Sequence, residues 1–328
     1  MANVNAKCTN CGAAIIVESM DEAVVCQQCG KAIIVKKAID YFKDVQCAVF
    51  DAKQLFPAGT IELLSLNAVG NHSIDDAIMD AAALVKKAGS PISDVFDRMI
   101  EGRLNNLKRV TGVVYVDKLG LSGTVGFDTI SVGNRAMIEQ MGDVNLPDVE
   151  VERKLNRKGC FMVYIARNDQ LCGMIAVKYS VKDEDIAEQI YNLTEEGVKV
   201  LVESCDPNIT SGLIARLFEI NEFAVEIMSS NSVDEYSKSV APAQNGDGVL
   251  AHHNSAAGLA CALTAIKRVK SVIKMGLVLQ IIGAVLGIAL SVFMIIAASH
   301  TAVTPALLLC YQLFTCLITI MVLSVKRI

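Results

Sequence analysis

The sequence lacks an excess of positive charge. Its 328 residues include 30 Lys and Arg against 35 Asp and Glu, giving a formal net charge of −5 and a pI of about 5.5. The chain therefore lacks the excess of basic residues that binds a phosphate backbone, and we expect no nucleic-acid partner. Tryptophan is absent, yet 52% of the residues are hydrophobic. The large apolar fraction and small net charge exclude a disordered chain, and the length predicts about two domains.

A secretory signal is also missing, because the first twelve residues are polar and contain no apolar segment. The 11 cysteines are odd in number and scattered over the whole chain. A disulfide framework therefore has little support. Reduced thiols on the cytoplasmic side of a membrane fit this cysteine usage better.

Charge is absent from two long runs near the C-terminus, residues 275–298 and 302–325, each of 24 residues. A membrane span needs about 20 apolar residues, so the runs predict a two-helix hairpin in a lipid bilayer. Two buried helices of a soluble core are the less favoured alternative. The positive-inside rule places both flanks, and with them both termini, in the cytoplasm. The basic flanks are Lys267, Arg268, Lys270 and Lys274 before the hairpin, and Lys326 and Arg327 after it.

Two CxxC pairs separated by 14 residues open the chain, and they consist of Cys8, Cys11, Cys26 and Cys29. Zn²⁺ prefers four soft ligands in a tetrahedron, which two such pairs supply. So short a module cannot bury enough core on its own, and zinc binding would supply its folding energy. The spacing predicts a structural zinc ribbon over residues 1–36, with short strands at 14–17, 23–25 and 32–35. Because the ribbon has few basic residues, we expect it to contact a protein.

Two apolar runs in the middle of the chain end close to carboxylates. Residues 45–50 lead into Asp51, and residues 197–202 lead toward Asp206. Buried strands with helices between them predict a doubly wound sheet, in which ligands bind at the carboxyl edge of the strands. A helix over 209–220, capped by Asn208, is expected after the second strand.

A long insertion separates these two strands. Helical spacing with a capping-type start at Ser73 predicts one helix, and a second helix is predicted from Ser90 to Ile100. Four strands are then expected, at residues 112–116, 124–132, 161–167 and 171–177. The pattern predicts a separate α+β domain inserted into the α/β domain.

Five short motifs follow one another through this region. They are Val49-Phe50-Asp51, Gly120 to Thr124, Ser131 to Met137, Gly173 to Ala176, and Gly197 to Asn208. Their order resembles the cytoplasmic half of P-type ATPases of the heavy-metal type, including the family motifs V-F-D-K-T-G-T, G-x-G-x-x-G, L-V-G-N-R-x-L-M and M-L-T-G-D-N. The resemblance covers about residues 45–325 and ends with a membrane hairpin.

The resemblance implies a haloacid-dehalogenase-like doubly wound sheet with an inserted nucleotide-binding-like α+β domain. The phosphorylation-like domain is expected at residues 37–58 and 179–270, the insertion at 59–178 and the hairpin at 271–328. Asp51 and Asp206 become the candidate catalytic carboxylates. Gly120 and Gly123 become candidates for nucleotide contact, and ATP with Mg²⁺ the candidate cofactors.

Several residues depart from the family motifs. Asp51 is followed by Ala52-Lys53-Gln54-Leu55 where the family has K-T-G-T, and Ser90 stands in place of the His of its H-P motif. Lys118 replaces the first glycine of the nucleotide motif. Of the magnesium motif only Gly246-Asp247-Gly248 is present, and a simple turn explains that tripeptide equally well. The predicted zinc ribbon precedes the resemblance, so we expect no counterpart of the family's upstream membrane helices.

Phosphoryl transfer depends on positioned charges and magnesium, so these departures favour a protein that has lost the activity. The first hypothesis is a membrane-anchored, non-transporting pseudo-ATPase that acts as a binding or regulatory module. The second is residual phosphatase or ATPase activity that uses Asp51 and Asp206. The third is part of a metal cation transporter, phosphorylated at Asp51, that pairs with other membrane helices.

Overall fold

A computed structural model of the chain describes residues 4–7, 14–17, 24–25, 28, 32–33, 42–69, 73–142, 146–239, 255–297 and 304–325. The chain divides into two compact units. The larger unit comprises residues 46–246 and 254–260, and the smaller one comprises residues 1–45, 247–253 and 261–328. Each unit is described separately.

A three-stranded parallel sheet forms one lobe of the larger unit, with strand order β13-β12-β5. The strands are β5 (Cys47–Asp51), β12 (Lys199–Glu203) and β13 (Val225–Ile227). The first two are those that the apolar runs predict, and Phe50, Val200 and Val202 are buried in them. The short strand β13 was not predicted. In the register Asp51 stands beside Glu203, so the carboxyl ends of β5 and β12 meet at one edge.

The helices of this lobe are α2 (Ala52–Leu55), α7 (Glu184–Glu195), α8 (Ser211–Leu217), α9 (Ser230–Ser239) and the 3₁₀ helix η2 (Glu222–Ala224). The prediction for α8 was wrong at both ends and in its cap. The helix begins after Thr210, whose hydroxyl accepts a hydrogen bond from the backbone N–H of Leu213 at 3.2 Å. Asn208 instead belongs to a turn in which its own N–H is bonded to Asp206.

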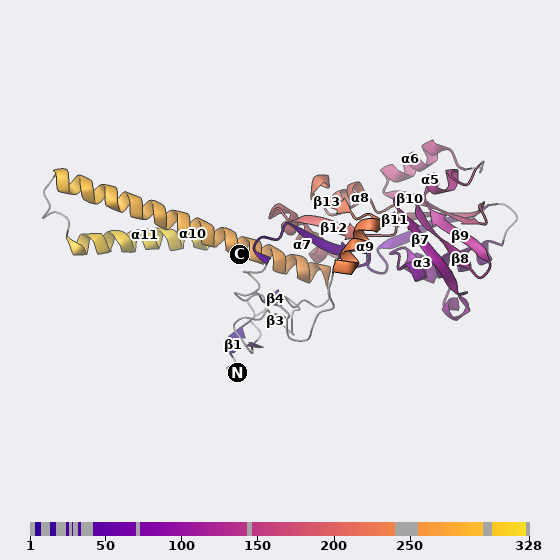
Figure 1. Cartoon of the computed structure of the whole chain (residues 1–328), viewed down its shortest axis with the longest axis horizontal. Coiled ribbons are helices and arrows are strands. Elements are labelled where there is room, and N and C mark those ends of the chain that lie inside the picture. Colours follow the sequence, from indigo (N-terminus) through magenta and orange to yellow (C-terminus); the bar gives the residue numbers. More distant parts are fainter. Residues whose placement is uncertain are drawn as a thin grey trace. The chain divides into compact units, whose positions relative to one another are not determined.

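The insertion forms a six-stranded antiparallel sheet, with order β6-β11-β10-β9-β8-β7. Figure 1 labels β7 to β11 of this sheet. The strands are β6 (Ile61–Ala68), β7 (Val110–Val116), β8 (Gly120–Val125), β9 (Asp128–Gly133), β10 (Cys160–Arg167) and β11 (Gln170–Tyr179). The single strand predicted at 124–132 is two strands, because Gly126 takes a left-handed φ of 66° and turns the chain. An α+β lobe inserted between β5 and β12 is confirmed.

Helices cover both faces of this sheet. They are α3 (Ile74–Ala88), α4 (Ser93–Met99), α5 (Arg135–Glu139), α6 (Val149–Arg157) and the 3₁₀ helix η1 (Arg103–Asn106). The Ser73 cap of α3 is confirmed, since its hydroxyl accepts from the N–H of Asp76 at 3.4 Å. A Cβ at Gly123 would meet Leu84 of α3, and one at Gly120 would meet Met137 of α5. Because the two glycines point to opposite faces of β8, α3 and α5 lie on opposite sides of the sheet.

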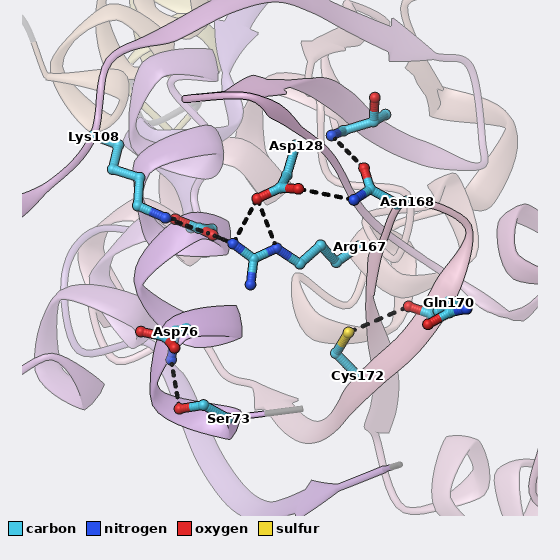
Figure 2. A network of polar contacts seen from close by, with 10 residues as sticks. Ser73, Asp76, Lys108, Asp128, Arg167, Asn168, Gln170 and Cys172 are labelled. Carbon is cyan, nitrogen blue, oxygen red and sulfur yellow. Dashed lines mark hydrogen bonds and ion pairs between the residues drawn. The ribbon is translucent and has the colours of Figure 1, made fainter. Parts of the chain in front are cut away.

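A polar network fixes α3 to the sheet (Figure 2). Asp80 of α3 is 1% exposed and pairs with Nζ of Lys108 at 2.8 Å and with Nη2 of Arg167 at 3.0 Å. The same Arg167 nitrogen lies 2.7 Å from Oδ2 of Asp128, and Asn168 donates to the other oxygen of Asp128. These bonds compensate the cost of burying the Asp80 carboxylate.

The smaller unit contains two long apolar helices, α10 (Ala256–Ala297), which begins in the larger unit, and α11 (Pro305–Val325). Both are long and apolar enough to cross a membrane, and only 6% of each apolar window is buried. They approach each other closely at Gly283 and Gly287 of α10, where an added Cβ would meet Thr315 and Tyr311 of α11. The Tyr311 hydroxyl donates to the carbonyl oxygen of Gly283 at 2.7 Å, and Nε2 of Gln280 donates to the Thr319 hydroxyl at 3.0 Å.

Four short strands precede β5, namely β1 (Val4–Lys7), β2 (Ala14–Val17), β3 (Val24–Val25) and β4 (Ala32–Ile33). They form two antiparallel pairs, β1 with β2 and β3 with β4. Strands β2 to β4 were predicted from the sequence, whereas β1 was not. Along the sequence each CxxC pair falls between the two strands of one pair. The cysteines themselves lie outside the described residues.

Candidate functional site

Asp51 ends the first strand of the parallel sheet and begins α2. Its backbone is extended, and its Oδ1 accepts a hydrogen bond from the N–H of Lys53 at 2.8 Å. Asp51 therefore caps a single turn of helix while its side chain stays exposed. This is the position at the carboxyl edge of the sheet that the sequence predicts.

Asp51 lines a cavity of about 530 Å³ between the parallel-sheet lobe and the inserted lobe. The inserted lobe contributes the end of α3, where Gly89 forms the cap, and three residues of β7. The parallel-sheet lobe contributes the ends of β5 and β12 and the start of α9. The lining residues are Asp51, Lys53, Ala88, Gly89, Pro91, Val113, Val114, Tyr115, Glu203, Ser204, Cys205, Met228, Ser230, Val233 and Asp234.

The charges of this cavity are mostly negative. Asp51, Glu203 and Asp234 line it together with a single cation, Lys53. Glu203 lies beside Asp51 in the strand register, and burial together with the Asp51 charge raises the pKa of Glu203. Nζ of Lys53 lies 3.5 Å from the position that a Cβ on Gly89 would take, at the C-terminus of α3. A helix C-terminus carries partial negative charge, so α3 partly compensates this one cation.

Asp206 faces the protein interior instead. It is 2% exposed and is not among the residues that line the cavity. Its Oδ2 accepts from the Tyr179 hydroxyl at 2.6 Å, and its Oδ1 accepts from the N–H of Asn208 at 3.0 Å. Burial raises the pKa of Asp206, while these two hydrogen bonds oppose the shift. The structure thus brings Asp51 together with Glu203, and Asp206 together with Tyr179.

The two residues before Asp206 are also engaged in local contacts. The Ser204 hydroxyl accepts from the N–H of Asp206 at 3.1 Å. The Cys205 thiol points to the carbonyl oxygen of Ala88 in the inserted lobe, with a sulfur–oxygen distance of 3.7 Å. Burial raises the pKa of Cys205 to about 11, so the thiol stays protonated at neutral pH.

Gly120 and Gly123 are packing positions in strand β8. A Cβ at Gly120, whose φ is 151°, would lie 2.4 Å from the Val132 carbonyl oxygen. A Cβ at Gly123 would lie 2.8 Å from Cδ1 of Leu84. Neither glycine lines the cavity beside Asp51. Close packing of α3, α5 and the neighbouring strand is thus sufficient to require glycine at both positions, and nucleotide contact by either one stays a prediction.

A contact that the sequence did not reveal joins the two lobes. The Asp117 carboxylate, at the tip of the β7–β8 hairpin, accepts from the N–H of Ser230 at 2.9 and 3.2 Å. A carboxylate at the first turn of α9 is favourable because it faces the positive end of the helix dipole. The partners are 113 residues apart, and no local pattern around either one signals the contact.

Within the described part of the chain, no three His, Cys, Asp or Glu side chains are grouped to hold a metal ion. The four predicted zinc ligands and the Gly246-Asp247-Gly248 segment lie outside that part. Three carboxylates and one lysine line the cavity beside Asp51, so it offers oxygen ligands of the kind that Mg²⁺ accepts but a single cation for a triphosphate.

Comparison with known proteins gives a consistent set of relatives. A copper-exporting P-type ATPase B of Archaeoglobus fulgidus is 25% identical over 221 residues, which cover 65% of this chain and 31% of the relative. A copper-transporting P-type ATPase of Rhizobium leguminosarum bv. viciae is 24% identical over 230 residues, which cover 69% of this chain and 27% of that relative. The matched region is thus less than a third of either relative.

Among solved structures, a zinc-transporting PIB-type ATPase in its E2.Pi state aligns with 90% of this chain and 52% of its own, with 16% identity and a TM-score of 0.36. The catalytic domain of the CPx-ATPase CopB-B aligns with 62% of this chain and 69% of its own, with 14% identity and a TM-score of 0.36. No family model matches the chain. By sequence, the chain is a homologue of the P-type ATPases of the heavy-metal type.

Proposed function

We propose that this protein is a membrane-anchored relative of P-type ATPases that neither transports ions nor undergoes phosphorylation at Asp51. In this proposal the two-lobed α/β body acts as a binding or regulatory module. The hairpin of α10 and α11 holds it at the membrane, with both termini on the cytoplasmic side.

The charge around Asp51 is the observation that carries this proposal. A transferred phosphoryl group spreads negative charge over its oxygens and needs cations to stabilise it. Asp51 has Glu203 beside it in the register and shares its cavity with Asp234, against the single cation Lys53. Carboxylates can hold Mg²⁺, but they repel the phosphates themselves, and the residues after Asp51 lack the hydroxyl and glycine that the resemblance implies for orienting phosphate and Mg²⁺. Because Asp206 is bonded to Tyr179, it is also not poised to act together with Asp51.

A second candidate function is ATP-dependent phosphorylation at Asp51 within a metal cation transporter. The exposed position of Asp51 on the wall of the cavity favours it, since a carboxylate at the edge of such a sheet is accessible to a reactant. The relatives named as copper-exporting and copper-transporting also favour it. ATP and Mg²⁺ would be the cofactors in that case.

Acyl-phosphate trapping separates the two candidates. The detergent-purified full chain is incubated with γ-labelled ATP and Mg²⁺, quenched in acid and tested for hydroxylamine-sensitive label, beside Asp51→Asn and the control Asp148→Asn. We expect no label in any of the three proteins. Label in the wild type and in Asp148→Asn that disappears in Asp51→Asn would establish phosphorylation at Asp51 and overturn the first proposal.

The zinc ribbon is a separate proposal, with Cys8, Cys11, Cys26 and Cys29 as structural ligands of Zn²⁺ and a protein as the partner. The spacing of the pairs and their positions between paired strands support it. Metal analysis of the purified chain should give one zinc per chain. Cys8→Ser should lose it, whereas Cys47→Ser, which removes an exposed thiol of the larger unit, should keep it. Equal zinc contents in the two variants would contradict this assignment.

A further inference from the structure

A basic cluster lies where α10 enters its apolar part. Four of its members are on α10, and the fifth comes from the segment that precedes β5. They are Lys43, Lys267, Arg268, Lys270 and Lys274, and Asp44 is a carboxylate that pairs with one of them, Lys270. The described residues of the cluster therefore carry a formal charge of about +4, from five cations and one anion.

Contacts within the smaller unit hold part of this cluster together. Lys270 forms an ion pair with Asp44, and its Nζ also donates to the carbonyl oxygen of Lys43 at 3.3 Å. The bond from Lys270 lowers the pKa of Asp44, and the charges of Lys43 and Lys267 add to the shift. Cations from two separate segments thus surround one carboxylate.

The length of α10 sets the height of the cluster relative to a bilayer. The uncharged part of the helix, residues 275–297, is about 34 Å long at 1.5 Å per residue, close to the ~30 Å of a hydrocarbon core. Lys274 directly precedes this part, and Lys270 and Lys267 precede it by about 8 and 12 Å. The polar layer on each side of the core is about 5–8 Å thick. The lysines therefore fall within or just outside the layer of lipid head groups.

We propose that this cluster, residues 43, 267, 268, 270 and 274, binds the head groups of anionic phospholipids, and that Asp44 competes with them for Lys270. The proposal depends on the hairpin lying in a membrane, and it is independent of whether Asp51 is phosphorylated. Lipid phosphates at the depth of Lys270 and Lys274 supply the charge that Asp44 only partly provides. Asp44 thus limits the affinity for anionic lipid.

The preference of the protein for an anionic over a zwitterionic lipid measures this head-group binding directly. The full chain is reconstituted in phosphatidylcholine membranes that contain a trace of spin-labelled phosphatidylglycerol or spin-labelled phosphatidylcholine. The fraction of each label that is motionally restricted gives the relative association constant of the anionic lipid. Four proteins are compared: the wild type, Asp44→Asn, the fourfold variant with Lys43, Lys267, Lys270 and Lys274→Gln, and a fourfold control with Lys87, Lys154, Lys158 and Lys238→Gln. The two fourfold variants change the net charge equally.

We expect the wild type to prefer the anionic lipid, with a preference that declines as salt is added. The cluster variant should lose about fivefold or more of this preference, because each basic residue at an anionic surface contributes about that factor. The control should keep it, and Asp44→Asn should increase it. Three results would each overturn the proposal: an equal preference in the cluster variant and the control, no increase in Asp44→Asn, or no restricted lipid of either kind. Asp44→Asn keeps the test informative even if the fourfold cluster variant fails to fold.

Discussion

Tyr179 donates its phenolic hydrogen bond to Oδ2 of Asp206 at 2.6 Å, and both side chains are almost completely buried. The bond joins the last strand of the inserted lobe to the loop after β12 in the parallel-sheet lobe. Phe56 and Phe161 contact Tyr179 edge-on, with ring centroids 5.8 and 5.6 Å away. The carboxylate that the family resemblance suggested for chemistry is thus part of an interface between lobes.

Removing this hydroxyl should destabilise the larger unit. Tyr179→Phe keeps the ring packing but leaves one oxygen of a buried carboxyl group without its partner. The expected loss is about 1–3 kcal/mol of unfolding free energy. Denaturant unfolding of the purified chain, followed by circular dichroism, measures it. Tyr191→Phe is the matched control, since Tyr191 is 43% exposed. Equal stabilities of the two variants would show that the bond contributes nothing.

Glu203 should make stability depend on pH. Burial and the neighbouring Asp51 charge raise its folded-state pKa above the unfolded value. Stability from this group is therefore fully present below the unfolded pKa and is lost as the pH rises through the folded pKa. Glu203→Gln should show a smaller fall in unfolding free energy between acidic and neutral pH. Unfolding titrations at a series of pH values test this, with Glu195→Gln as the control, and parallel curves for wild type and Glu203→Gln would refute it.

The sequence predicts the elements whose signals are local. The apolar runs before Asp51 and toward Asp206 predict β5 and β12, because buried parallel strands consist of continuous apolar residues. Ser73 marks the start of α3 because a hydroxyl there can accept an orphan N–H of the first turn. Strand β6 was missed because it is an edge strand with mostly exposed side chains, among them Leu64 at 50%.

The arrangement of the site could not be predicted because its contacts connect distant residues. Asp51 was expected at the sheet edge and lies there, but its neighbour Glu203 depends on the β5–β12 register. The residues next to Asp206 in the sequence do not indicate whether its side chain faces the cavity or Tyr179. The glycine pattern at Gly120 and Gly123 predicts ligand contact, and it could not reveal that both positions are also closely packed against α5 and α3.

Gly123→Ala should therefore destabilise the inserted lobe. The new methyl group would lie 2.8 Å from Cδ1 of Leu84, which is fully buried in α3. Overpacking of this kind costs about 1–3 kcal/mol. In a Leu84→Ala background the same change should cost much less, and a double-mutant cycle gives the difference. Gly212→Ala is the control, because its Cβ would meet only the flexible end of Glu222 at 3.3 Å. An equal cost in both backgrounds would contradict the steric explanation.

Arg167→Met tests the network around Asp80. The change removes one of the two cations on a carboxylate that is 1% exposed, and it also removes the cation paired with Asp128, which keeps its bond from Asn168. Breaking a buried pair completely costs about 3–5 kcal/mol, so with Lys108 retained we expect a loss of about 2–3 kcal/mol. Arg153→Met breaks an exposed pair with Glu150 and should cost about 0.5 kcal/mol or less. If the two variants lost equal stability in denaturant unfolding, the network would have no special role.

The membrane hairpin should depend on a close approach at Gly287. A Cβ there would lie 2.7 Å from Cε1 of Tyr311, so Gly287→Val should push α10 and α11 apart and weaken the Tyr311–Gly283 hydrogen bond. The cost should exceed the ~0.6 kcal/mol that one such bond contributes in a membrane, which Tyr311→Phe measures alone. The midpoint of unfolding by SDS in mixed micelles is the readout, with Ile288→Val, at a 67% exposed position, as the control. In a Tyr311→Ala background the steric conflict is absent, so Gly287→Val should then shift the midpoint little. A full-sized shift in that background would mean that the two helices do not pack through Gly287 and Tyr311.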